Sequence, residues 1–332
     1  MGANEFNAFV VQEGEGAFTG EIKKRRVEEL PDNDLLVRVH YSSLNYKDAL
    51  SATGNKGVTK QYPHTPGIDA VGVVMNDISG RFQENDAVIV TGYDLGMNTD
   101  GGFGGYIKVP SEWAVSLPEG MTMKESMIFG TAGLTAGLSV LRLTETVKTA
   151  HGKIAVSGAT GGVGALSVGI LARLGYSVSA ISGKEEERGF LLGLGADEVI
   201  PRQEYEAENS RPLLKGEFAG AIDTVGGNIL TAIVKSTRPM GIVTCCGNVA
   251  SPKLDLTVYP FILRGVSLIG IDSQNCPMEQ REIVWKKLAG EWKPDDLLDL
   301  CREISLSQLP ESIDQILAGK LKGRTVVNIQ SI

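Results

Sequence analysis

The residues of this 332-residue chain best suited to chemistry form a glycine-rich loop, Gly158-Ala-Thr-Gly161-Gly162-Val-Gly164. The loop follows a β-rich run at residues 153–159 and opens a stretch with helical apolar spacing at 163–174. A strand, a glycine loop and a helix in that order are typical of a dinucleotide-binding site. One of the usual glycines is replaced by alanine, and an ordinary glycine-rich turn is the alternative. The predicted contacts to the dinucleotide are Thr160, Gly161, Gly162 and Val163.

Each glycine of the loop has its own physical reason. A side chain at Gly161 would block a pyrophosphate that approaches the backbone. The helix that begins near Gly162 offers free N–H groups and the positive end of its dipole to that anion. Gly164 allows the helix to pack closely on the strand.

The type of nicotinamide cofactor is indicated about 20 residues further on, where an NAD site usually has a carboxylate for the ribose 2′-hydroxyl. The chain has Ser182-Gly183-Lys184 at this point, with no acid. Ser182 can donate a hydrogen bond to a 2′-phosphate and Lys184 can supply charge, with Arg188 or Arg202 in support. The pattern predicts NADPH, although Lys184 as a solvated cap residue is an open alternative.

Elements that alternate between strand and helix surround this site. Residues 153–246 show five β-rich runs, most of them separated by helical patterns, which predicts a doubly wound parallel sheet of the Rossmann type. The first 125 residues or so contain short β-rich runs between turns and favour a separate β-rich domain. The last run, at 325–329, is too short to fold alone, and we expect it to return to the first domain. The chain is therefore predicted to be an α/β protein of two domains.

Composition narrows the classes of partner. The net charge is 32 − 40 = −8, and an acidic surface disfavours binding to nucleic acid. No uninterrupted apolar run of about 18 residues predicts a membrane span, and the N-terminus does not resemble a secretory signal. The four cysteines lack metal-binding spacing, so free thiols and a cytoplasmic location are expected.

Several further segments together resemble the medium-chain dehydrogenase/reductase superfamily. Two of them are Ser42-Ser-Leu-Asn-Tyr-Lys-Asp48 and Pro66-Gly-Ile-Asp-Ala-Val-Gly-Val-Val74. More narrowly, the chain is similar to the zinc-free quinone oxidoreductase branch and its acryloyl-CoA reductase group. The resemblance implies a GroES-like catalytic domain at 1–125 and 265–332 and a Rossmann domain at 126–264. The other matching segments are residues 100–106, 130–136, 194–200, 220–227 and 260–265.

The resemblance also locates the place of the catalytic zinc in the alcohol dehydrogenases of the superfamily. At the three ligand positions this chain has Asn45, Ile68 and Thr131, with Asp69 beside Ile68. Isoleucine cannot bind a metal, and amide and hydroxyl oxygens are poor zinc ligands beside thiolate or imidazole. His64 lies nearby in sequence, but one histidine makes a weak site. We therefore expect no metal.

Without a Lewis acid, the expected reaction is reduction of an already polarised acceptor. Hydride addition to an alkene conjugated to a carbonyl places negative charge on the carbonyl oxygen, where hydrogen-bond donors can stabilise it. The favoured acceptor is an acryloyl-CoA-like enoyl thioester. The alternatives are a quinone, as in zeta-crystallin-type reductases, and a catalytically silent NADPH-binding protein.

The resemblance places Asn45 and Thr131 near the nicotinamide. We expect Asn45 Nδ2 or Thr131 Oγ1 to orient the carbonyl or the nicotinamide, and Asp48 to hold Tyr46, Lys47 or a backbone group. Tyr46 is a candidate proton donor, in competition with Tyr41 and with solvent. The local pattern of Asn45–Asp48 is equally typical of an Asx-capped turn.

The remaining expected cofactor contacts lie in later segments and are implied by family position. Gly247 ends a predicted strand, Arg264 could meet a phosphate or form a surface ion pair, and Arg324 belongs to a basic cluster that could approach the adenosine phosphate. Thr135 lies in the matching segment 130–136. The apolar run 266–271 could pair across a twofold axis, so we expect a homodimer.

Overall fold

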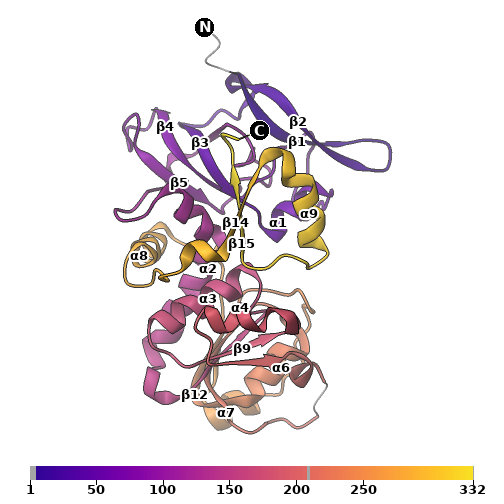
Figure 1. Cartoon of the computed structure of the whole chain (residues 1–332), viewed down its shortest axis with the longest axis vertical. Coiled ribbons are helices and arrows are strands. Elements are labelled where there is room, and N and C mark those ends of the chain that lie inside the picture. The colour runs from indigo at the N-terminus through magenta and orange to yellow at the C-terminus, as the bar shows by residue number, and fades with distance from the viewer. Residues whose placement is uncertain (1–4, 208–209, 332) are drawn as a thin grey trace. The chain divides into compact units, whose positions relative to one another are not determined.

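The computed structural model describes residues 5–207 and 210–331, and these form two compact units (Figure 1). The boundaries differ from those predicted, because residues 126–131 join the first unit whereas 265–273 and 284–296 join the second. Helix α2 (Met123–Thr146) continues past Thr131, which moves the first boundary. The first unit is Met1–Thr131, Gln274–Ile283 and Leu297–Ile332, and the second is Ala132–Ser273 and Val284–Asp296, each counted over its described residues.

The first unit is built on a mixed β-sheet with strand order β14-β15-β3-β4-β5-β7, where β6 pairs with β3. A separate antiparallel hairpin of β1 (Glu5–Glu13) and β2 (Phe18–Arg26) precedes it. This arrangement confirms the predicted β-rich domain. The strands of the larger sheet are β3 (Leu35–Ser43), β4 (Asp69–Asp77), β5 (Ala87–Thr91), β6 (Tyr106–Val109), β7 (Ala114–Ser116), β14 (Cys301–Ser305) and β15 (Arg324–Asn328).

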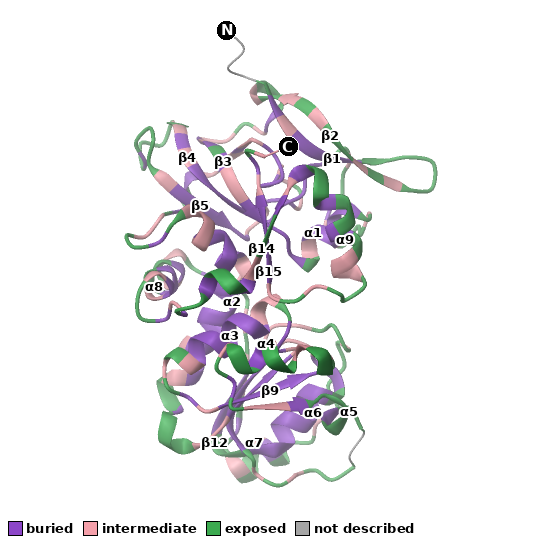
Figure 2. Ribbon diagram, viewed as in Figure 1, coloured by how far each residue is buried: buried purple, intermediate pink, exposed green. Residues whose placement is uncertain are grey.

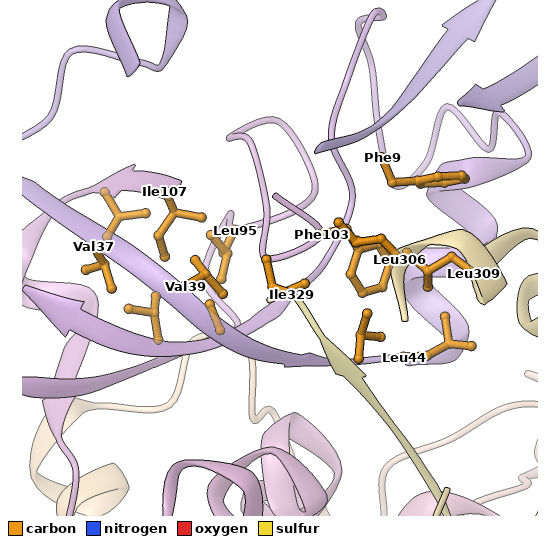
Figure 3. Close-up of a cluster of buried hydrophobic side chains, with 14 of the residues drawn as sticks. Phe9, Val37, Val39, Leu44, Leu95, Phe103, Ile107, Leu306, Leu309 and Ile329 are labelled. Carbon is orange, nitrogen blue, oxygen red and sulfur yellow. The ribbon is translucent and has the colours of Figure 1, made fainter. Parts of the chain in front are cut away.

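The core of the first unit follows from the alternation of side chains along its strands. Leu35, Val37 and Val39 on β3 are buried on one face of the sheet, as the two-residue period of a strand requires. They join a cluster that includes Phe103 and Leu306 (Figure 3). Full burial of such a side chain stabilises a fold by about 1.5–3 kcal/mol.

The C-terminal strand returns to the first unit, as predicted. β15 pairs antiparallel with β3, and Val326 lies opposite Ser43. This pairing brings Arg324, the first residue of β15, to the end of β3 where the candidate catalytic residues begin. The helices of this unit are α1 (Tyr46–Ala52), α9 (Leu309–Leu317), and the first parts of α2 and α8 (Met278–Ala289).

The second unit is a parallel sheet with strand order β10-β9-β8-β11-β12-β13. This is the doubly wound order in which the chain starts at the centre and reverses direction once, so the predicted Rossmann fold is confirmed. Strand β9 and most of helix α3 are buried (Figure 2). The strands are β8 (Ile154–Ser157), β9 (Val178–Ser182), β10 (Glu198–Pro201), β11 (Phe218–Asp223), β12 (Thr237–Cys245) and β13 (Ser267–Gly270). The helices are α3 (Gly162–Arg173), α4 (Arg188–Gly193), α5 (Gln203–Glu206), α6 (Gly227–Ser236) and α7 (Tyr259–Arg264).

Helix α2 was not predicted from the sequence. By length and composition it could span a membrane: its most apolar 18-residue stretch has a mean hydropathy of 1.3. However, 78% of that stretch is buried inside the protein, and buried core helices can have the same length and composition. Gly130 interrupts it with φ 51° and ψ −153°, a conformation that favours glycine.

Candidate active site

The glycine loop joins β8 to α3 in the way the sequence predicted. A Cβ on Gly164 would lie 2.3 Å from the carbonyl oxygen of Gly158, so the start of the helix packs directly on the loop. A Cβ on Gly161 would meet only Gly158 O, at 3.3 Å. The protein therefore leaves space beside Gly161, at the N-terminus of α3, where an anion can approach the backbone.

Two neighbouring strand ends hold the loop in place. Ser157 Oγ donates to Asp223 Oδ1 at 2.6 Å, and Thr224 Oγ1 donates to the Ser157 carbonyl at 2.9 Å. Burial raises the pKa of Asp223. A Cβ on Gly247 would lie 1.9 Å from Thr224 O, so packing alone requires glycine there, and contact of Gly247 with a cofactor stays a prediction.

The carboxyl end of β9 brings the predicted phosphate-binding residues together. Ser182 Oγ accepts the amide of Lys184 at 3.0 Å. A Cβ on Gly183 would lie 2.6 Å from both Cδ and Nε of Arg202, so the side chain of Arg202 lies directly over Gly183. Arg202 also forms an ion pair of 2.8 Å with Glu206. The Ser182 hydroxyl, the backbone of Lys184 and the Arg202 side chain thus lie together where the 2′-phosphate was predicted.

Thr135 and Arg264 have different surroundings from this group. Thr135 Oγ1 donates to Ser273 Oγ at 2.6 Å, and its contact with a cofactor stays a prediction. Contact of Arg264 with a phosphate also stays a prediction. Its guanidinium donates to the carbonyls of Lys235 and Thr237, both at 2.9 Å. These groups lie where α6 ends and β12 begins, at the edge of the sheet opposite the strand carboxyl ends that bind ligands.

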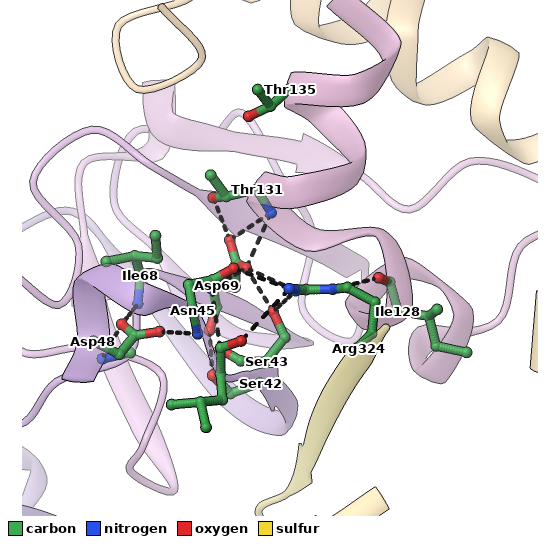
Figure 4. Close-up of polar contacts among 12 residues, drawn as sticks. Ser42, Ser43, Asn45, Asp48, Ile68, Asp69, Ile128, Thr131, Thr135 and Arg324 are labelled. Carbon is green, nitrogen blue, oxygen red and sulfur yellow. Dashed lines mark hydrogen bonds and ion pairs between the residues drawn. The ribbon is translucent and has the colours of Figure 1, made fainter. Parts of the chain in front are cut away.

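In the first unit, the candidate catalytic residues converge on one carboxylate, that of Asp69 at the start of β4 (Figure 4). Asp69 is fully buried. It accepts hydrogen bonds from Ser43 Oγ at 2.6 Å, Asn45 Nδ2 at 2.8 Å and Thr131 Oγ1 at 2.6 Å. The amide of Thr131 also donates to both of its oxygens, at 2.9 and 3.0 Å.

These bonds occupy the hydrogens of Asn45 Nδ2 and Thr131 Oγ1, while the expectation that one of these groups orients the carbonyl or the nicotinamide stays a prediction. The second N–H of the Asn45 amide donates to Ser43 O at 3.2 Å, and the Thr131 hydroxyl hydrogen is given to Asp69. Burial removes water from the carboxylate oxygens, and these donors replace the lost hydrogen bonds. From the sequence, Asp69 stands out only as the neighbour of Ile68. An acid at the start of a strand with a buried pattern was the available signal.

Asp48 holds backbone groups, one of the three roles considered for it. Its Oδ1 accepts the amides of Gly67 at 3.1 Å and Ile68 at 2.8 Å, and its Oδ2 accepts the Asn45 amide at 2.7 Å. The side chain is fully buried. Burial, together with the neighbouring Asp69, raises the pKa of Asp48 to about 7.

Tyr46 differs from the other predicted catalytic residues because its side chain is not part of this buried network. It begins α1 and is 47% exposed. The next residue, Lys47, donates from Nζ to Gln274 Oε1 at 2.6 Å. A role of Tyr46 as proton donor stays a prediction.

The surroundings of Arg324 differ from the predicted approach to the adenosine phosphate. The residue is only 4% exposed. Its Nε donates to the Ile128 carbonyl and its Nη2 to Ser43 Oγ, both at 2.8 Å. The pairing of β15 with β3 carries the side chain into the Asp69 network instead of to the surface.

The positions that the resemblance matches to zinc ligands hold an apolar side chain and bonded polar groups. Ile68 is buried, and its amide binds Asp48. In residues 5–207 and 210–331, no group of three or more His, Cys, Asp or Glu side chains is placed to hold a metal ion. His64 is also buried, and burial lowers the pKa of its imidazole.

Comparison with known proteins identifies the family. Family models match residues 162–290, described as a zinc-binding dehydrogenase, and residues 31–119, described as an alcohol dehydrogenase GroES-like domain. An acrylyl-CoA reductase, AcuI of Ruegeria pomeroyi, is 38% identical over 329 residues, which cover 98% of this chain and 100% of the relative. The chain belongs to the medium-chain dehydrogenase/reductase superfamily. Its relatives place it in the quinone oxidoreductase-like branch.

Solved structures show the same two-domain fold in this superfamily. The YhfP protein of Bacillus subtilis with NAD bound has a TM-score of 0.96 and 40% identity, with coverage of 98% of this chain and 100% of that one. Its name as a quinone oxidoreductase is provisional. The YhdH oxidoreductase of Salmonella enterica in complex with NADP has a TM-score of 0.94 and 38% identity, over 97% of this chain and 99% of that one.

The raised pKa of Asp48 predicts a pH-dependent stability. The folded protein holds this proton up to about pH 7, whereas the ordinary pKa is 3.8. The contribution of Asp48 to the free energy of unfolding is therefore complete below about pH 4 and is lost as the pH rises to 7, at roughly 1.4 kcal/mol per pKa unit. We expect the stability of the wild type relative to Asp48→Asn, measured by urea unfolding, to fall across this range. A difference that stays constant or grows with pH would contradict the assignment.

Proposed function

We propose that the chain is an NADPH-dependent, metal-independent reductase of activated C=C bonds. The observation that carries this proposal is the Asp69 network. At the positions that hold zinc in alcohol dehydrogenases, Asn45 and Thr131 bind Asp69 and Ile68 offers only hydrocarbon. Oxidation of an alcohol needs a group that stabilises an alkoxide, whereas an electron-poor alkene is already polarised for hydride addition.

The second unit fits a phosphorylated dinucleotide. The open space at Gly161 and the N-terminus of α3 would receive the pyrophosphate, and Ser182, Lys184 and Arg202 would surround the 2′-phosphate. When bound, the reduced nicotinamide supplies the hydride. NADP in the YhdH structure supports this choice, and NAD in the YhfP structure makes the preference worth measuring.

Residues of the first unit would handle the acceptor. The hydroxyl of Tyr46 is exposed and can donate a proton or a hydrogen bond. Thr131 Oγ1 has given its hydrogen to Asp69, so toward a ligand its oxygen acts as an acceptor for an N–H or O–H. Asn45 and Asp48 would fix the start of α1, which carries Tyr46, instead of touching the reacting atoms.

The favoured substrate is an acryloyl-CoA-like enoyl thioester. AcuI of Ruegeria pomeroyi, named an acrylyl-CoA reductase, matches this chain over its full length, which supports the thioester. The provisional name of YhfP keeps a quinone as the second candidate.

Lys184 tests the cofactor preference. We expect the wild type to bind NADPH at least tenfold more tightly than NADH, because Lys184 and Arg202 attract the 2′-phosphate. In Lys184→Glu the ratio should fall at least tenfold, as measured by fluorescence titration with both cofactors. Glu279→Lys, an exposed change in α8, is the charge control and should leave the ratio unchanged. Equal wild-type affinities would refute the preference.

Steady-state assays test the reaction. With NADPH, we expect turnover of acryloyl-CoA to exceed that of a naphthoquinone, and EDTA treatment followed by dialysis to change the rate by less than twofold. A faster quinone reaction would favour the alternative acceptor. NADPH binding without oxidation by any enone or quinone would favour a silent binding protein, and loss of turnover on metal removal would exclude the metal-independent reaction.

We also infer a homodimer formed through the second unit. β13 is an edge strand of its sheet. Apolar side chains gather next to it on and around α7, where Ile262 is 68% and Leu263 is 63% exposed. A Cβ on Gly265 would lie 2.9 Å from Met240 Sδ, so Met240, which is also exposed, extends this surface. Exposed edges and apolar patches of this kind are usually covered by a partner.

A charge in this patch should disrupt the dimer. We expect the wild type to sediment at twice the 35.4 kDa chain mass at micromolar concentration, and Ile262→Glu to shift toward the monomer because the carboxylate would have to be buried. Ile78→Glu is the matched control, since Ile78 is 72% exposed in the first unit, and it should remain dimeric. A monomeric wild type would remove the inference.

A further inference from the structure

The break in α2 is held by two opposite charges. Before Gly130, the Ile128 carbonyl accepts from Arg324 Nε at 2.8 Å. After it, the Thr131 amide donates to Asp69. A cation at the carboxyl end of one helical segment and an anion at the amino end of the next both match the helix dipole. Arg324 and Asp69 therefore stabilise the break from its two sides.

Gly130 lets the two charges approach the helix. A Cβ at this position would lie 2.4 Å from Asp69 Oδ2, 2.7 Å from Ser43 Oγ and 3.1 Å from Arg324 Nη2. The network thus packs directly against the backbone of α2, one residue before Thr131. The position of Thr131 relative to Asp69 depends on this contact.

Arg324 also determines how Asn45 and Ser43 are used. Its Nη1 donates to Asn45 Oδ1 at 3.2 Å, which turns the Asn45 amide nitrogen toward Asp69. Its Nη2 donates to Ser43 Oγ at 2.8 Å, which turns the Ser43 hydroxyl hydrogen toward Asp69 at 2.6 Å. The direct distance from Nη2 to Asp69 Oδ2 is 3.9 Å, so the guanidinium acts on the carboxylate chiefly through these two side chains.

A buried guanidinium is costly unless its N–H groups and its charge are compensated. Burial lowers the pKa of Arg324 and the charge of Asp69 opposes that change. Arginine nevertheless stays charged in proteins. Compensation of the buried charge alone would not require the guanidinium to bind Asn45 and Ser43 in particular.

We propose that Arg324 is a positioning residue for the reductase reaction, which acts through Ser43, Asn45 and Asp69 to fix Thr131 at the break in α2. This inference rests on the proposed function, but it assigns a different role to Arg324 than contact with the 2′-phosphate.

The test compares Arg324→Met, Arg324→Lys and the control Arg302→Met, which removes a guanidinium bound to Gln315 and Ser312 at the surface of the same unit. We expect Arg324→Met to lower kcat for acryloyl-CoA at least tenfold, while the ratio of the NADH and NADPH dissociation constants, from fluorescence titration, stays within twofold. Arg324→Lys should recover part of kcat because it keeps the charge but not the fixed set of donors. Arg302→Met should match the wild type in both measurements.

Three results would overturn the proposal. The first is a folded Arg324→Met enzyme with kcat within twofold of the wild type. The second is a selective loss of NADPH affinity, which would indicate a phosphate contact. The third is equal loss in Arg324→Met and Arg324→Lys that follows the fraction of folded protein. Wild-type turnover of acryloyl-CoA is measured first. A wild type without turnover would refute the proposed function and not the role of Arg324. The ratio of the NADH and NADPH dissociation constants would still show whether Arg324 contacts the phosphate.

If Arg324→Met does not fold, Ser43→Ala provides the second variant. It removes the link from Arg324 Nη2 to Asp69 and leaves the bond of Arg324 to Ile128. We expect a severalfold decrease in kcat with an unchanged cofactor ratio. Wild-type kcat in folded Ser43→Ala would likewise overturn the proposal.

Discussion

The buried carboxylate of Asp69 is the interaction on which the arrangement of the first unit depends. It joins the end of β3, the start of α1, the broken helix α2 and, through Ser43 and Asn45, the C-terminal strand β15. These segments are far apart in the sequence. An unsatisfied buried carboxylate would be strongly destabilising, so its partners are held in place together.

The network also decides the polarity of the candidate site. From the sequence alone, Asn45 and Thr131 suggest hydrogen-bond donors for a ligand, because an amide and a hydroxyl can both donate. In the structure Asp69 accepts hydrogen bonds from both of those side chains, whereas the side chain of Tyr46 is exposed. The proposed chemistry therefore depends on the cofactor and on Tyr46 more than on Asn45.

The sequence predicted features that rest on local patterns. The glycine loop, the alternation of strands and helices in the second unit and the group Ser182–Lys184 all follow from neighbouring residues. The bonds that Arg264 and Arg324 form could not be predicted, because a cation's partners are set by strands and helices that meet only after folding. The same holds for Asn45, whose donors could not be assigned before Asp69 was known to lie 2.8 Å away. Helix α2 was missed because glycine interrupts its pattern at Gly130.

The shared use of Asp69 has a consequence for how this lineage could change. A thiolate or imidazole installed at Asn45 or Thr131 would remove a donor from Asp69 before any ion was present to compensate it. Each single replacement would thus pass through a less stable protein, and several would have to arise together. A metal site at these positions would therefore be difficult to build one residue at a time.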